Sequence, residues 1–148
     1  MAGNHQIPPA PRGVELEGRA AVAALRDGAA STISRLSGRS GRVVVLGDTP
    51  QLPSDPLDCL SSNPEHILRC AVARSVAVEA DWFDAEQSVA TELGAGFVDI
   101  PALVCPADPC PMVIGRFLVF QDTNHVTPAY AEALSSRILG AIGPVPGS

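Results

Sequence analysis

Apolar positions along the chain fall into helical stripes and short unbroken runs. Residues 14–38 and 81–96 carry apolar side chains at helical spacing, which predicts two helices. Gly38 is the stop signal of the first helix, and Gly94 or Gly96 ends the second. The predicted inward positions are Val22, Leu25, Ala29, Ile33 and Leu36 in the first helix and Phe83, Val89 and Leu93 in the second.

The unbroken apolar runs predict strands. Residues 42–48 follow a glycine turn and are typical of a buried parallel strand. Residues 96–103 predict a second short strand. Residues 112–120 indicate either two short strands around Gly115 or one kinked extended piece.

Proline positions separate these elements and begin two further helices. Two proline-rich segments are predicted to be loops, residues 49–64 and 101–113. A short helix is expected within residues 64–75, with Pro64 at its first position. Thr127 is expected to cap a final helix that starts at Pro128. The inward face of that helix is formed by Tyr130, Leu134 and Ile138.

The order helix, strand, helix, strand, helix predicts an α/β fold, with three α/β/α layers and a short parallel sheet. Only two parallel strands are recognisable, whereas such sheets usually contain more and are covered on both faces. The sheet is therefore expected to be incomplete at its N-terminal side. The length of 148 residues indicates one domain, expected over residues 14–142. Residues 1–13 are expected to form a disordered arm and residues 143–148 a flexible tail.

Composition and charge narrow the classes of partner. The net charge is −6 and the isoelectric point is near 4.9, with no basic cluster, which argues against nucleic acid and anionic membranes as partners. No apolar run approaches the roughly 18 residues of a membrane span. The first residues lack the charged and apolar regions of a signal peptide. No cofactor motif is present.

Four cysteines suggest cross-links between irregular segments. Their spacing permits two local bridges, Cys59 with Cys70 and Cys105 with Cys110, although three pairings are possible and the residues alone do not choose. A zinc site with His66 is a weaker alternative, because zinc sites usually contain a tightly spaced cysteine pair. Free buried thiols are a third. Disulfides would imply an oxidising compartment.

Asp122 precedes His125 by three positions, between an expected strand and the last helix. A carboxylate on one ring nitrogen fixes the tautomer, which leaves the other nitrogen able to take a proton from a hydroxyl. Such a pair would lie at the carboxyl edge of the sheet, where open α/β sheets bind ligands. The alternative is that Asp122 caps a turn and His125 is a solvated loop residue.

The wider context of this pair carries a family resemblance. Residues 117–131, with the strand-like FLVF, then QDTNHVT and a helix, resemble the last block of the SGNH (GDSL-type) esterases and acyltransferases. The similarity is to the SGNH domain at the C-terminus of membrane acyltransferases of the acyltransferase-three, O-antigen-acetylase type. Residues 43–60, VVVLGDTPQLPSDPLDCL, and residues 97–115, FVDIPALVCPADPCPMVIG, also resemble that group, and the match covers roughly residues 20–141.

The resemblance implies a flavodoxin-like SGNH fold and roles for named residues. His125 stands at the position of the general base and Asp122 at that of its orienting acid. It also implies disulfides that pair Cys59 with Cys70 and Cys105 with Cys110 in an extracytoplasmic domain. Val126 stands where a leucine is more usual.

The family nucleophile is a serine in a Gly-Asp-Ser block that begins a helix. The nearest text here is Gly47-Asp48-Thr49. Pro50 disfavours a helical conformation at Thr49, and the residues that follow cannot form the presenting helix. Thr49 is therefore predicted not to be the nucleophile, and the serine block is expected to lie before residue 1.

Three functions remain in competition. The first is the C-terminal portion of an SGNH-type O-acyltransferase or esterase domain, which acts on acyl groups, acetyl above all, of cell-envelope glycans. Its acyl donor and glycan acceptor would be reached through a parent membrane acyltransferase. The second is a non-catalytic exported remnant or binding module of the same fold. The third, ranked last, is a cysteine metal module.

Overall fold

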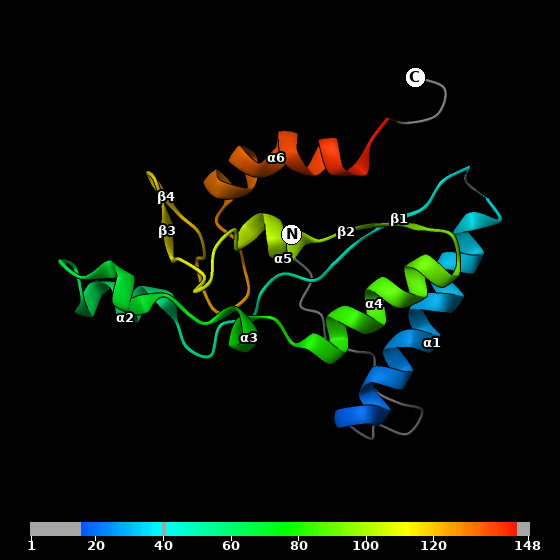
Figure 1. Cartoon of the computed structure of the whole chain (residues 1–148), viewed down its shortest axis with the longest axis horizontal. Coiled ribbons are helices and arrows are strands. Elements are labelled where there is room, and N and C mark those ends of the chain that lie inside the picture. The colour runs from blue at the N-terminus through cyan, green and yellow to red at the C-terminus, as the bar shows by residue number, and fades with distance from the viewer. Residues whose placement is uncertain (1–15, 40, 145–148) are drawn as a thin grey trace. The chain divides into compact units, whose positions relative to one another are not determined.

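The computed structural model describes residues 16–39 and 41–144, so the expected arm at residues 1–13 and most of the expected tail at 143–148 lie outside it. Figure 1 shows the elements in chain order. The chain divides into two compact units. The first consists of Met1–Val45 and Asp81–Phe97, and the second of Leu46–Ala80 and Val98–Ser148.

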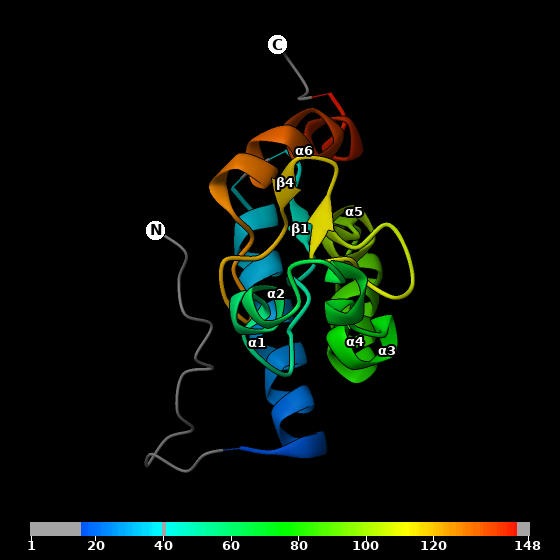
Figure 2. The ribbon, with the colours of Figure 1, turned by 90° about the vertical axis from the view of Figure 1, so that its left-hand side faces the viewer.

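Two helices form the body of the first unit, α1 (Gly18–Ser37) and α4 (Ala80–Glu92), and they lie side by side in Figure 1 and Figure 2. The core consists of Ile33, Val89 and Ala90. Partly buried residues of both helices and of the neighbouring strands pack against it, namely Ala29, Ala30, Val43, Val45, Ala95 and Phe97. At the rim, Arg26 and Glu92 form an ion pair at 3.0 Å between the two helices.

Both predicted helices are confirmed, including the stop at Gly38 and a turn at Gly94 with φ +71°. That positive φ favours glycine because other side chains are strained there. The predicted inward stripes are wrong at their last positions. Leu36 is 48% exposed and Leu93 is 41% exposed, and each lies in or just beyond the final turn of its helix.

The parallel sheet is short. Strand β1 (Val44–Leu46) pairs with β2 (Gly96–Val98), and the bonds Gly96 N–H to Val43 O and Gly47 N–H to Val98 O, both 2.9 Å, have the parallel pattern. This confirms the α/β class and the short parallel sheet. The expectation of a buried first strand is wrong, since Val44 and Val45 are only half-buried and the side chain of Leu46 is 48% exposed.

Short helices open the second unit, at positions that differ from the prediction. Helix α2 (Pro56–Ser62) begins within the segment expected to be loop, because Asp55 accepts the N–H of Leu57 at 2.8 Å and Pro56 occupies the first position. Pro64 begins no helix. The 3-10 helix η1 (Ile67–Cys70) and α3 (Arg74–Ala77) follow instead.

The second predicted strand is also shorter than expected. Strand β2 stops at Val98, and helix α5 (Ile100–Val104) occupies residues expected to be strand and loop. The reason is local, because the Asp99 side chain accepts the N–H of Ala102 at 2.7 Å and caps the new helix.

The C-terminal elements follow the prediction closely. Strands β3 (Val113–Ile114) and β4 (Phe117–Leu118) form an antiparallel hairpin around Gly115, which confirms the two-strand alternative. Helix α6 (Pro128–Ile142) is capped by Thr127, as predicted. Its buried face consists of Tyr130 and Leu134, with Ile138 half-buried.

The first unit gives a direct test of its core. Ile33→Ala should lower the free energy of unfolding by about 2–5 kcal/mol, because it leaves a cavity against Val89 and Ala90. Leu36→Ala in the same helix is the matched control and should change it by less than about 0.5 kcal/mol. Urea denaturation followed by circular dichroism measures both. Equal losses in the two variants would contradict this packing.

Candidate functional site

The loop between β4 and α6 is closed at its base. Phe120 and Val126 form an antiparallel bridge, and Gln121 N–H donates to His125 O at 2.9 Å. Phe120 is fully buried, which anchors the start of the loop in the core of the second unit. Residues 121–125 therefore form a tight loop whose two ends are held together.

The Asp122 side chain holds the conformation of this loop. Its Oδ1 accepts the backbone N–H groups of Asn124 at 2.9 Å and His125 at 2.8 Å. Its Oδ2 lies 2.7 Å from Nδ1 of the His125 ring. An ionised carboxylate only accepts hydrogen bonds, so Nδ1 carries the proton and Nε2 of the neutral ring is the acceptor.

The electrostatics keep Asp122 ionised. The pKa of its carboxyl lies below the usual 3.8, chiefly because the Asn124 N–H bonds to the charged form. Partial desolvation opposes this shift, and the N–H and ring of His125 add to it. A charged acceptor is thus held against the imidazole at neutral pH.

The second ring nitrogen of His125, Nε2, is on the side of the ring away from Asp122. Nothing within residues 16–39 and 41–144 hydrogen-bonds to Nε2, and the side chain is 28% exposed. Asp122 does cap the turn, as the simpler sequence interpretation expected, but it also binds the ring. The pair therefore has the arrangement in which an imidazole can take a proton from a hydroxyl.

Thr49 lies against the same loop. Its hydroxyl donates to Asn124 O at 3.0 Å, and Leu52 N–H donates to Thr123 O at 2.6 Å. The segment that leaves the carboxyl end of β1 thereby supports the loop of Asp122 and His125. Thr49 begins no helix, in line with the effect expected of Pro50, and the next helix, α2, starts only at Pro56. No sequence signal marks this contact, because Thr49 and Asn124 are 75 residues apart.

The cysteines are paired in the structure. Cys59 bonds to Cys70 with Cα atoms 5.8 Å apart, and Cys105 to Cys110 with Cα atoms 5.0 Å apart. Both separations suit disulfides. His66 is exposed, and the described part of the chain holds no cluster of three or more His, Cys, Asp or Glu suited to a metal. Bridged sulfurs are not zinc ligands, so this geometry favours the disulfide alternative.

Comparison with known proteins gives one match. A model of the family described as "SGNH domain (fused to AT3 domains)" matches residues 2–140. No curated protein and no solved structure matches the chain. Among the described residues, no helix is both long enough and apolar enough to cross a membrane.

The depressed pKa of Asp122 predicts a pH dependence of stability. Its contribution is complete above the unfolded pKa of about 3.9 and is lost as the pH falls through the lower folded pKa. Asp122→Asn should therefore be less stable than the wild type at pH 7, with the difference shrinking below about pH 4. Urea titrations across this range measure it. The control Asp84→Asn, on the exposed face of α4, should show no such convergence, and a constant difference for Asp122→Asn would contradict the assignment.

The contact of Thr49 predicts local destabilisation of the loop. Thr49→Val keeps the shape but removes the donor to Asn124 O, so amide exchange of residues 121–125 should accelerate about 2- to 10-fold. Thr49→Ser retains a hydroxyl and should exchange nearly as the wild type. Hydrogen exchange followed by NMR measures both variants. Unchanged exchange in Thr49→Val would show that the hydroxyl does not hold the loop.

Proposed function

Because the chain belongs to the family of SGNH domains that are fused to AT3 domains, we propose that it serves an SGNH-type O-acyltransferase or esterase. In this proposal the domain moves or removes acyl groups, acetyl above all, on cell-envelope glycans. The observation that carries the proposal is the contact of Asp122 with Nδ1 of His125 at 2.7 Å, with Nε2 left without a partner among the described residues.

The proposed mechanism assigns one step to each member of this pair. Nε2 of His125 takes the proton of a serine hydroxyl as its oxygen attacks the acyl carbonyl, and Asp122 stabilises the imidazolium that forms. The imidazolium then returns the proton to the leaving alcohol, which leaves an acyl-serine. A glycan hydroxyl or water attacks this ester in the reverse sequence, giving the acylated glycan or the free acid.

The serine is proposed to come from a Gly-Asp-Ser block outside residues 1–148. Thr49 is the nearest substitute in sequence, but its hydroxyl donates to Asn124 O and it does not begin a helix. A hydroxyl used in this way supports the loop and is not presented to an acyl group. Oxyanion donors would accompany the serine block, as such donors usually cluster with the nucleophile.

The proposed setting is extracytoplasmic. Two disulfide pairs support it, because structural disulfides form and persist in oxidising compartments. The fusion to AT3 domains in this family supports a parent membrane acyltransferase, through which acyl donor and glycan would be reached.

We also propose a second candidate function, a non-catalytic binding module, because one observation favours it. No serine of the described residues hydrogen-bonds to His125, which is also what a non-catalytic exported binding module would have. The two proposals differ in whether His125 ever meets a hydroxyl nucleophile.

The activity of the chain by itself tests the missing nucleophile. Release of p-nitrophenol from its acetate should stay near the background of free imidazole, because loss of the serine and of oxyanion donors costs many orders of magnitude in rate. His125→Ala and the matched control His66→Ala, an exposed residue outside the loop, should lower this background by similar amounts. Efficient turnover that only His125→Ala abolishes would instead place the nucleophile within the chain, and Thr49 would be the first residue to substitute.

The catalytic role itself needs the serine block. The reading frame upstream of Met1 should encode a strand that ends in Gly-Asp-Ser, and the protein that contains it should lose at least about 10³-fold in acyl transfer with His125→Ala. A stop codon there, or full activity of His125→Ala, would favour the binding module.

A further inference from the structure

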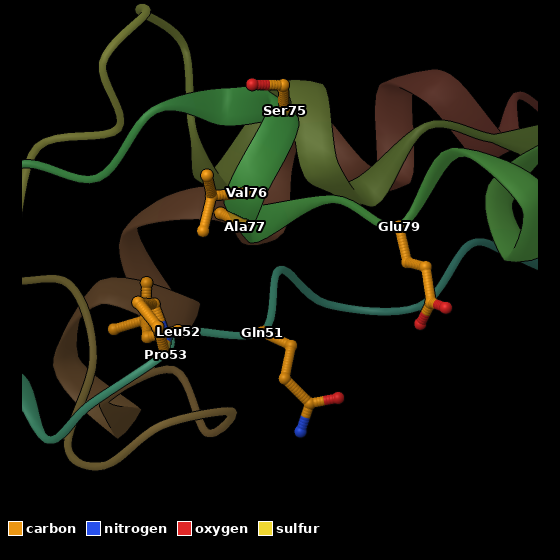
Figure 3. A pocket seen from close by; sticks show the side chains of 7 residues that line it. All are labelled: Gln51, Leu52, Pro53, Ser75, Val76, Ala77 and Glu79. Atoms are coloured by element: carbon orange, nitrogen blue, oxygen red, sulfur yellow. The ribbon is translucent and has the colours of Figure 1, made fainter.

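We propose that a hollow next to the loop of Asp122 and His125 binds an uncharged sugar ring of the acceptor, an inference that rests on the proposed acyl transfer. The hollow has a volume of about 290 Å³ and is lined by residues 51–53, residues 75–77 and Glu79 (Figure 3). Ligand pockets start near 300 Å³, so this one suits a single ring and not a long chain.

The lining of the hollow is hydrogen-bonded to the loop that carries Asp122 and His125, the candidate catalytic dyad. Gln51 N–H donates to Ala77 O at 2.7 Å, which joins the two walls of the hollow. The next residue, Leu52, donates its N–H to Thr123 O at 2.6 Å, inside the loop that carries the dyad. A ligand held here would therefore lie on backbone that is bonded directly to the candidate general base's own loop.

The lining combines the groups that recognise a sugar. Figure 3 shows the Gln51 amide and the Glu79 carboxylate extending on the same side of the ribbon. Neither side chain has a hydrogen-bond partner among the described residues. An amide donates and accepts while a carboxylate accepts, which matches hydroxyls that do both. Apolar surface comes from Pro53 and Val76, of which Val76 is 58% exposed, whereas the Leu52 side chain is buried.

Charge selects against an anionic ligand. Among the described residues that line the hollow, Glu79 is the only charged one. The cation next to Ser75 in the chain is Arg74, and its guanidinium donates to Cys105 O at 2.8 Å and pairs with Asp99 at 3.9 Å. A phosphate or carboxylate would meet repulsion and no counter-charge, whereas a neutral ring can use every polar group present.

The test is a titration of the complete 148-residue chain, followed by amide NMR. The probes are the methyl glycosides of glucose and of N-acetylglucosamine, with glucose 6-phosphate as the anionic comparison. The neutral glycosides should shift the amide signals of Gln51, Leu52 and residues 75–79 saturably, with a Kd in the range of about 1–10 mM. The phosphate should bind several-fold more weakly. No saturable shift of these amides up to about 100 mM glycoside would overturn the proposal.

Two pairs of variants locate the binding. Gln51→Ala and Glu79→Gln should each raise the Kd about 3- to 10-fold. Their matched controls, Gln87→Ala on α4 and Glu65→Gln in the turn before η1, are exposed and should leave it unchanged. Equal effects in variants and controls would place the sugar elsewhere.

These outcomes separate the subsite from the catalytic proposal. If the sugar binds here while His125→Ala leaves acyl transfer intact in the serine-containing protein, the catalytic role of the dyad is wrong and the sugar site stands. If acyl transfer requires His125 but these amides do not respond to glycosides, the subsite is wrong and the catalytic proposal stands.

Discussion

The carboxylate of Asp122 is the interaction on which the candidate site depends. It accepts N–H groups from the backbone of Asn124 and His125 and from the His125 ring. The first two turn the backbone and the third orients the imidazole, so the direction of the ring is coupled to the shape of the loop. A neutral side chain at this position could not accept all three equally well. The charge that would stabilise an imidazolium is thus the same charge that folds the loop.

That loop is supported from a distant part of the chain. The segment after β1 reaches it through the Thr49 hydroxyl and the Leu52 N–H, and its Gln51 N–H binds Ala77. One short stretch without helix or strand therefore connects three places: the loop of the dyad, α3 and the sugar-sized hollow. In the proposed function the Gly-Asp-Thr segment would lie close to the site without providing the nucleophile, because its hydroxyl supports the loop.

Disulfides compensate for the small size of the elements in the second unit. Helices of seven residues (α2) and four residues (α3) are too short to be stable alone. One bridge joins α2 to η1, and the other closes the loop after α5. Val72 and Cys110 exchange two backbone hydrogen bonds, which links the bridged segments to each other. Cross-links and backbone pairs thus fasten these short helices and loops to one another.

Features that depend on near neighbours could be predicted from the chain alone. The stop at Gly38, the cap at Thr127, the hairpin around Gly115 and the spacing of Asp122 and His125 all act within a few residues. At Asp55 and Asp99 the side chains cap helices in segments predicted to be loop and strand, although both residues are local cap signals. Tertiary packing sets which apolar residues stay exposed, as at Leu36 and Leu46, and which remote groups meet. The contact of Thr49 with Asn124 spans 75 residues, and burial and long-range hydrogen bonds arise from packing that no local pattern encodes.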